Sequence, residues 1–165
     1  MAASSVSDGP QELQNCDAIR QGCLTLAQST RRSLRILSRD LEPEFYDNGA
    51  FLEAVRQVAL SGYGVPVRIL LVDAVPAVRN GHRLIEMARL LSSLVQIRKV
   101  PEEYDVQPET YLLSDENGYL LRCRPEEFRA TAHFRDPRRV RLLGRRFEEI
   151  WDLGAFHAEL RRLYL

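Results

Sequence analysis

Three short apolar runs, separated by two helical patterns, constrain the fold of this chain more than any other feature. The runs are SLRILS at Ser33–Ser38, VRILLV at Val67–Val72 and VQIRKV at Val95–Val100. The middle run is almost wholly apolar, as expected of a strand that is buried on both faces. Strands joined by helical connections of this length favour parallel pairing with right-handed crossovers. The sequence therefore predicts an α/β domain.

Capping residues predict where the helices of this domain begin. Asn48 and Asn80 can each cap a helix whose apolar residues follow at helical spacing. Pro10 suits the start of a helix, and the apolar residues behind it recur every three or four positions. The three sets of apolar residues are Phe51, Val55, Val58 and Ala59; Leu84, Ala88 and Leu91; and Leu13, Cys16, Ile19, Cys23 and Leu26.

After Val100 the pattern changes to a hairpin. The runs TYLLS and YLLRC flank Asn117-Gly118, and Asn-Gly between apolar runs is a strong hairpin signal. The segment Phe128–Phe134 is a further candidate strand, and Asp136-Pro137 can open a long helix that Gly154 ends. The apolar face of that helix holds Val140, Leu143, Phe147, Ile150 and Trp151, and a short final helix would hold Phe156, Leu160 and Leu163. We predict one mixed α/β domain over residues 10–165, with a mostly parallel sheet flanked by helices, after a flexible tail at 1–9.

Composition excludes several classes of protein. No stretch approaches the roughly 20 apolar residues of a membrane span, so we expect no membrane partner. The first ten residues lack the pattern of a secretory signal. Cys16, Cys23 and Cys123 form no C-x-x-C pair, and the first two are interpreted as buried apolar residues. A cytoplasmic location is therefore expected.

The net charge of zero conceals two charged segments of opposite sign. Residues 101–127 carry eight acidic residues and two arginines, a balance of −6, whereas residues 129–146 carry seven arginines and one aspartate, a balance of +6. Lys99 is the only lysine. A bias toward arginine codons would explain this, and so would selection of guanidinium groups for phosphate or carboxylate partners.

The order and spacing of these segments resemble one half of a phospholipase D-like domain. The resemblance rests on SLRILSRDLEPEFYD, on VRILLVD, on VQIRKV followed by ETYLLSDENGYLL, and on the final FEEIW. It covers Leu34 to Trp151 and is similar to uncharacterised bacterial domains, some of them attached to GNAT-like acetyltransferases. The resemblance implies a phospholipase D-like half-domain.

In active members of that superfamily, a His-x-Lys-x-x-x-x-Asp motif supplies a histidine that attacks phosphorus, a lysine that steadies the phosphoryl oxygens and a supporting aspartate. With Asp115 as the aspartate, this chain has Pro108 and Thr110 in place of the histidine and lysine. With Lys99 as the lysine, the histidine position holds Ile97. Because the nucleophile and the charge stabiliser are both missing, we expect no phospholipase D-type catalysis.

No other chemistry has a clear signature in the sequence. His82 and His157 are interpreted as surface or core residues, and His133, beside the arginines, is the one histidine that could belong to a site. The chain has no Gly-rich phosphate loop and no Gly-x-Ser-x-Gly, and we expect no cofactor. The acidic residues of 101–127 have no metal-ligand pattern, so no metal site is predicted.

Two functional classes remain. The first is a non-catalytic interaction module with a protein partner, an acetyltransferase being one candidate. The second is a binder of nucleic acid or another phosphorylated ligand through Arg138, Arg141 and Arg145, which share one helix face, with His133 nearby. The neutral net charge and the lack of aromatic residues clearly interleaved with the arginines favour the first class.

A homodimer is also expected. The resemblance implies two halves that meet across a shared site, and this chain has the length of one half. An isologous two-fold interface is the commonest way to pair such halves.

Overall fold

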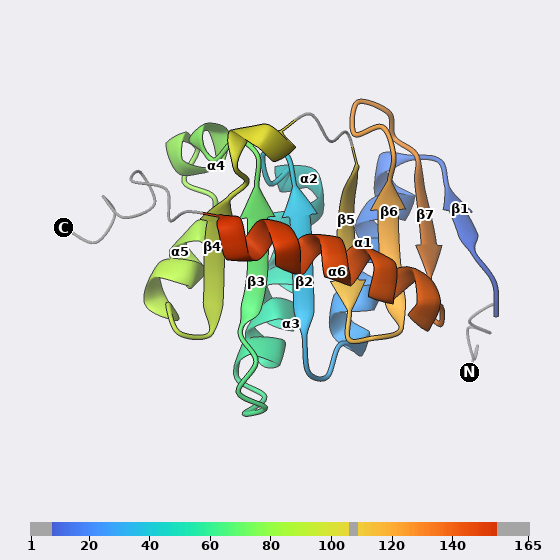
Figure 1. The fold of residues 1–165 in the computed structure, drawn as a ribbon, viewed down its shortest axis with the longest axis horizontal. Helices are drawn as coiled ribbons and strands as arrows, with labels where there is room; N and C mark the ends of the chain where they lie inside the picture. Colours follow the sequence, from blue (N-terminus) through green and yellow to red (C-terminus); the bar gives the residue numbers. More distant parts are fainter. Residues whose placement is uncertain (1–7, 106–108, 155–165) are drawn as a thin grey trace.

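The computed structural model describes residues 8–105 and 109–154. Within these residues seven strands form one sheet in the order β1-β7-β6-β5-β2-β3-β4 (Figure 1). The strands are β1 (Gln11–Leu13), β2 (Leu34–Ser38), β3 (Val67–Leu71), β4 (Val95–Lys99), β5 (Thr110–Ser114), β6 (Gly118–Arg122) and β7 (Ala130–His133). The apolar runs and the hairpin predicted from the sequence all correspond to strands. The predicted short helix at the C-terminus and residues 1–7 of the predicted tail lie outside the described residues.

The sheet is mostly antiparallel, so the prediction of a mostly parallel sheet was wrong. β2 pairs with β3 and β3 with β4 in parallel, as the strand-helix order predicted. β5, however, lies antiparallel to the other side of β2, and β6, β7 and β1 continue the sheet in antiparallel fashion. The antiparallel pairings made by the hairpin and by the two strands beyond it therefore outnumber the parallel pairings.

Helices cover both faces of the sheet. They are α1 (Cys16–Ser29), α2 (Pro43–Tyr46), α3 (Gly49–Ala59), α4 (Val75–Arg79), α5 (Arg83–Leu90) and α6 (Pro137–Leu153), with a short 3-10 turn η1 (Glu102–Tyr104). α6 crosses one face alone, and α1 and α3 lie on the other (Figure 1). The predicted caps at Asn48 and Asp136 are confirmed: Asn48 accepts from the Phe51 N–H, and Asp136 accepts from the Arg139 N–H.

The N-terminal helix begins later than predicted. Asn15, not Pro10, precedes its first turn and accepts a hydrogen bond of 2.8 Å from the Ala18 N–H. The residues between them form β1, which pairs with β7 and supplies partners for the hydrogen-bonding groups along that edge of the sheet. A three-residue strand fixed only by this long-range pairing gives no periodic signal in the sequence.

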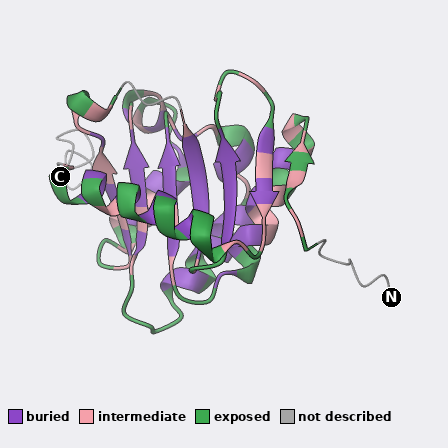
Figure 2. Ribbon diagram, turned by 45° about the vertical axis from the view of Figure 1, so that its right-hand side comes forward, coloured by how far each residue is buried: buried purple, intermediate pink, exposed green. Residues whose placement is uncertain are grey.

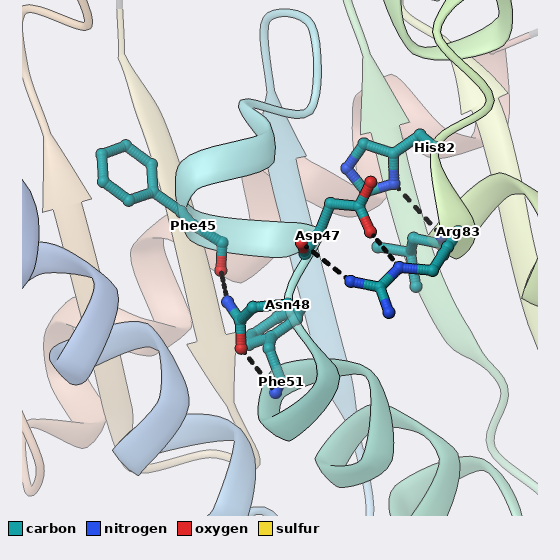
Figure 3. Close-up of polar contacts among 7 residues, drawn as sticks. Phe45, Asp47, Asn48, Phe51, His82 and Arg83 are labelled. Atoms are coloured by element: carbon teal, nitrogen blue, oxygen red, sulfur yellow. Dashed lines mark hydrogen bonds and ion pairs between the residues drawn. The ribbon is translucent and has the colours of Figure 1, made fainter.

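The third predicted helix begins two residues later than expected, and a short helix that was not predicted precedes it. Asn80 ends α4 instead of capping a helix, and Gly81 follows with a positive φ of 65°. The buried His82 then caps α5, its Nδ1 accepting from the Leu84 N–H at 3.1 Å. Figure 3 shows the neighbouring contact, in which Arg83 Nε donates to the Asp47 carboxylate at 2.7 Å and joins α5 to the end of α2.

Two apolar cores lie on opposite faces of the sheet. The larger core packs α1, α2, α3 and α5 against the strands, and the smaller one packs α6 against them. All five apolar residues predicted for α6 are buried, and Figure 2 shows its outer side exposed while the central strands are buried. In the larger core Cys23 is buried as predicted, while Cys16 is only partly so. No helix among the described residues has the length and apolar character to cross a bilayer.

Candidate functional site

The position of the phospholipase D motif lies at the start of β5. Pro108 is outside the described residues, and Thr110, the first residue of the strand, is buried. Thr110 is paired across the hairpin with Arg122, the last residue of β6. Residues directly opposed in antiparallel strands project to the same face of a sheet. Thr110 therefore shares its face with a buried arginine.

Arg122 is held in a buried ion pair. Its Nη1 lies 2.5 and 2.7 Å from the two carboxylate oxygens of Glu42, which comes from the loop before α2. Its Nη2 donates to the backbone carbonyls of Pro125 and Glu127. The guanidinium also lies 5.0 Å from the centre of the Phe45 ring. Only 3% of the arginine side chain is exposed, so its charge is engaged within the protein.

Two further polar side chains lie next to this ion pair. The thiol of Cys23 and the hydroxyl of Tyr46 are hydrogen-bond partners. Burial raises the pKa of Cys23 to about 12, and burial also raises the pKa of Tyr46. Both groups are therefore neutral at physiological pH, and neither provides an activated nucleophile.

Asp115 holds the backbone of the loop before β2. Its Oδ1 accepts from the N–H groups of Arg32 and Ser33 at 2.8 and 3.0 Å, and its Oδ2 accepts from Arg31 at 3.0 Å. Its own N–H donates to the Ser33 carbonyl at 2.8 Å. Asp115 also has a positive φ of 51°, a conformation that aspartate and asparagine tolerate in turns. All of these contacts are with backbone.

The structure separates the residues that the sequence grouped as a phosphate-binding surface. Arg138, Arg141 and Arg145 are all exposed on α6, and Arg141 and Arg145, but not Arg138, line a cavity beside that helix. His133 is on β7, where its Nδ1 accepts from the Arg135 N–H at 3.1 Å and its ring lies 6.0 Å from that of Tyr119. It lines neither of the cavities beside α6.

Two adjoining cavities lie between α6 and the loops at one end of the sheet. The first has a volume of about 680 Å³ and the second about 600 Å³. Their walls share Arg35, Glu116, Asn117 and Glu148, so the two cavities adjoin, and together they are here called the α6 cleft. In Figure 1 this end of the sheet is the lower one, where the β5–β6 turn and the loop before β3 lie.

Arginines from the sheet project beneath α6 into this region. Arg35 on β2 and Arg68 on β3 are opposed in register, and both approach Glu148, with Nη1–Oε distances of 3.6 and 2.8 Å respectively. Gly144 lets the Arg35 side chain pass, because a Cβ there would lie 2.7 Å from Arg35 Nη1. Arg68 also lies over the ring of Trp151, at 5.2 Å.

An exposed aromatic ring accompanies these arginines. Arg32, which lines the second cavity, has its guanidinium carbon 5.2 Å from the centre of the Tyr63 ring. Tyr63 is 58% exposed in the loop between α3 and β3. This pair was not predicted from the sequence, where only the arginines of the α6 segment were considered as a binding surface.

Sequence reasoning missed most of the cleft. A weak signal exists, since LRILS, VRILL and VQIRK each place an arginine within an apolar strand. By contrast, nothing local connects Arg122 with Glu42, which lie 80 positions apart. Among the described residues, no group of three histidine, cysteine or acidic side chains is placed to hold a metal ion, and all three cysteines are free.

Comparison with known families identifies the domain. A family model described as a domain of unknown function, DUF7931, matches residues 15–163. The chain belongs to this family. A search of curated proteins gave no match.

Solved structures show which fold the DUF7931 domain has. Nuc from Salmonella typhimurium, a phospholipase D family member, matches with a TM-score of 0.63 at 13% identity, over 90% of this chain and 97% of its own. NucT from Helicobacter pylori matches with a TM-score of 0.59 at 8% identity, over 90% and 99%. The fold is therefore phospholipase D-like, as the sequence resemblance implied.

A third structure is similar over part of its length. TrmBL2, an archaeal chromatin protein with a described mode of DNA binding, matches with a TM-score of 0.62 at 14% identity. The match covers 92% of this chain but 55% of TrmBL2, so the DUF7931 domain spans about half of that protein. At these identities the three likenesses concern the fold alone.

Proposed function

We propose that this protein is a degenerate, single-half phospholipase D-like domain that acts as a non-catalytic interaction module. The observation that carries the proposal is which residues occupy the expected positions of the catalytic motif. Thr110 occupies the place of the lysine, and it is buried opposite an arginine that is already bound to Glu42. Arg122 is therefore not free to stabilise a transferring phosphoryl group, and Pro108 has no nucleophilic side chain.

The partner that we propose is a GNAT-like acetyltransferase, because similar bacterial domains are attached to such enzymes. Titration calorimetry with a purified GNAT-like acetyltransferase from the same organism tests this partner. We expect saturable binding with a one-to-one ratio of the two chains. Absence of binding heat at two temperatures would exclude the acetyltransferase as partner.

A phosphorylated ligand is the second candidate, and one observation favours it. Arg141 and Arg145 line the α6 cleft together with Arg35, so three guanidinium groups face one concave site. Filter binding of single-stranded DNA at 50 and 200 mM salt separates the two candidates. Phosphate-driven binding must weaken steeply with salt, whereas a module specific for a protein partner retains no DNA at either concentration.

A further inference from the structure

The guanidinium groups of the α6 cleft have unused hydrogen-bonding capacity. Arg141 and Arg145 form no hydrogen bond or ion pair with any described residue. Arg35 is 15% exposed, its Nη1 is 3.6 Å from Glu148, and its buried Nε has no hydrogen-bond partner among the described residues. A tetrahedral anion in the cleft would accept charge-assisted hydrogen bonds from the exposed Arg141 and Arg145, next to the positive charge of Arg35.

Charge is distributed unevenly along the cleft. Arg141 and Arg145 come from the first half of α6, whereas Glu149 and Asp152 line the same cavity from its last turns. Glu116 and Glu148 line it as well, and the charge of Glu148 is offset by Arg35 and Arg68. With a rise of about 1.5 Å per residue, the two pairs are roughly 10 Å apart along the helix axis. One end of the cleft therefore favours an anionic group, and the other offers acceptors for hydroxyl groups and repels a second anion.

The rim of the cleft offers a surface for a flat ring. Arg32 lies over the exposed ring of Tyr63 and also lines the second cavity, beside Arg35. Planar guanidinium and phenol groups stack readily on aromatic bases. The first cavity alone, at about 680 Å³, is within the size range of small-molecule sites.

We propose that the α6 cleft binds a nucleoside monophosphate. Its phosphate lies against Arg35, Arg141 and Arg145, its ribose hydroxyls donate to the carboxylates of Glu149 and Asp152, and its base stacks at Arg32 and Tyr63. This inference deepens the second candidate function, that of a phosphorylated-ligand binder, and rests on it. It names a small ligand and a site separate from the motif position at Thr110.

Titration calorimetry of the full chain with AMP tests the proposal. Replacing both cleft arginines, Arg141→Ala with Arg145→Ala, should weaken AMP binding about tenfold or more, because each loses a charge-assisted hydrogen bond. Arg138→Ala is the matched control, since it removes an exposed arginine of the same helix that does not line the cleft, and it should change the affinity less than about twofold. Thermal melting of each variant verifies that it is folded.

A second arm tests recognition of the ring. Tyr63→Ala should weaken AMP binding about fivefold, the loss of one modest stacking contact, and leave the binding of ribose 5-phosphate unchanged. Absence of AMP binding to the parent protein would overturn the proposal, as would equal affinities for AMP and ribose 5-phosphate. An equal loss in Arg138→Ala would show general surface attraction and would overturn it too.

These outcomes are separable from those of the proposed function. A protein that binds ribose 5-phosphate as tightly as AMP is still a phosphorylated-ligand binder, although it does not recognise the base. Failure of the acetyltransferase titration concerns only the protein partner. Hydrolysis of a phosphodiester by the parent protein would contradict only the proposed lack of catalysis at the motif position.

Discussion

At the scale of single residues, Asp115, which the sequence resemblance places at the aspartate of the motif, has well-defined contacts. Its carboxylate accepts three backbone N–H groups from residues 31–33 and so joins the loop before β2 to the β5–β6 turn. Turn geometry also explains an aspartate at this position, because aspartate tolerates a positive φ. The contacts give it a structural role that needs neither a histidine nor a lysine.

Replacing Asp115 therefore tests a role in stability. Asp115→Ala leaves three N–H groups without their acceptor and places alanine at positive φ, so we expect a loss of about 2–3 kcal/mol in the free energy of unfolding. Asp115→Asn keeps one acceptor oxygen and tolerates the same φ, and should lose about 1 kcal/mol. Urea denaturation measures both. Equal stability of the alanine variant and the parent would contradict this role.

Arg122 leads to a prediction that depends on pH. Arg122→Met leaves the Glu42 carboxylate, which is 21% exposed, without its partner, and near neutral pH this should cost about 1–3 kcal/mol in the free energy of unfolding. Burial already raises the pKa of Glu42 from its ordinary value of 4.5, and Arg122 opposes that rise. Removal of Arg122 therefore raises the pKa of Glu42 further.

The sign of the pH effect follows from linkage. A carboxyl group whose pKa is raised by folding favours the folded state at low pH and loses that contribution as pH rises through its folded pKa. The stability difference between the parent and Arg122→Met should therefore be larger at pH 8 than at pH 4.5 by urea denaturation. Between Glu42→Gln and the double variant Glu42→Gln with Arg122→Met, neither of which has a carboxyl group at position 42, the stability difference should not vary with pH. A difference that is constant for the single variant would disprove the coupling.

At the scale of elements, α6 is fixed to the sheet by an aromatic anchor near its C-terminus. Trp151 is 2% exposed, its ring stacks on Phe147 at 5.9 Å, and Arg98 lies over it at 4.4 Å. Arg98 Nη1 also donates to the Trp151 carbonyl at 2.7 Å. This end of α6 thus holds the helix in place above the cleft.

Loss of this anchor should lower the free energy of unfolding substantially. Trp151→Ala removes a fully buried ring, and we expect a loss of about 3–5 kcal/mol in the free energy of unfolding. Leu142→Ala on the same helix is the control: Leu142 is 60% exposed, and the change should cost less than about 0.5 kcal/mol. Thermal and urea unfolding measure both variants. Similar losses in the two would show that α6 does not pack as described.

The elements also show what sequence can and cannot predict. The caps at Asn48 and Asp136, the hairpin and the buried face of α6 were predicted because their signals are local. The antiparallel majority of the sheet was not, since it depends on which side of β2 receives β5. β1 was mistaken for helix because three residues carry no periodicity.

In the candidate site, too, the features with local signals were predictable and those that depend on tertiary packing were not. The exposure of Arg138, Arg141 and Arg145 was predictable from helical spacing. That Arg141 and Arg145 line the cleft while Arg138 does not was not predictable. Which of these residues line the cleft depends on where α6 crosses the sheet. The ion pair of Arg122 with Glu42 and the position of Arg35 beneath Gly144 are likewise products of tertiary packing.

At the scale of the whole molecule, we predict a homodimer. The DUF7931 domain corresponds to nearly the whole chain of Nuc and of NucT, hence to a single unit of the fold. α1 covers β5 and β6, so the interface that we expect lies at the loop between β6 and β7, where Phe128 is 53% exposed. Phe128 also separates the −6 and +6 segments, and a two-fold axis there would oppose them.

Light scattering coupled to size exclusion decides the oligomeric state at micromolar protein. A mass near twice 19.0 kDa supports the dimer, and Phe128→Glu should then shift the protein toward the monomer. A parent protein that elutes only as a monomer would refute the prediction.

Hydrolysis of bis(p-nitrophenyl) phosphate tests most directly the claim that this phospholipase D-like domain is not catalytic. Since Pro108 and Thr110 replace the nucleophile and the charge stabiliser, the purified protein should release p-nitrophenol no faster than buffer. Asp115→Asn, which keeps the fold, serves as the matched control and should give the same background. Turnover by the parent protein that persists through repurification and disappears in Asp115→Asn would contradict the claim.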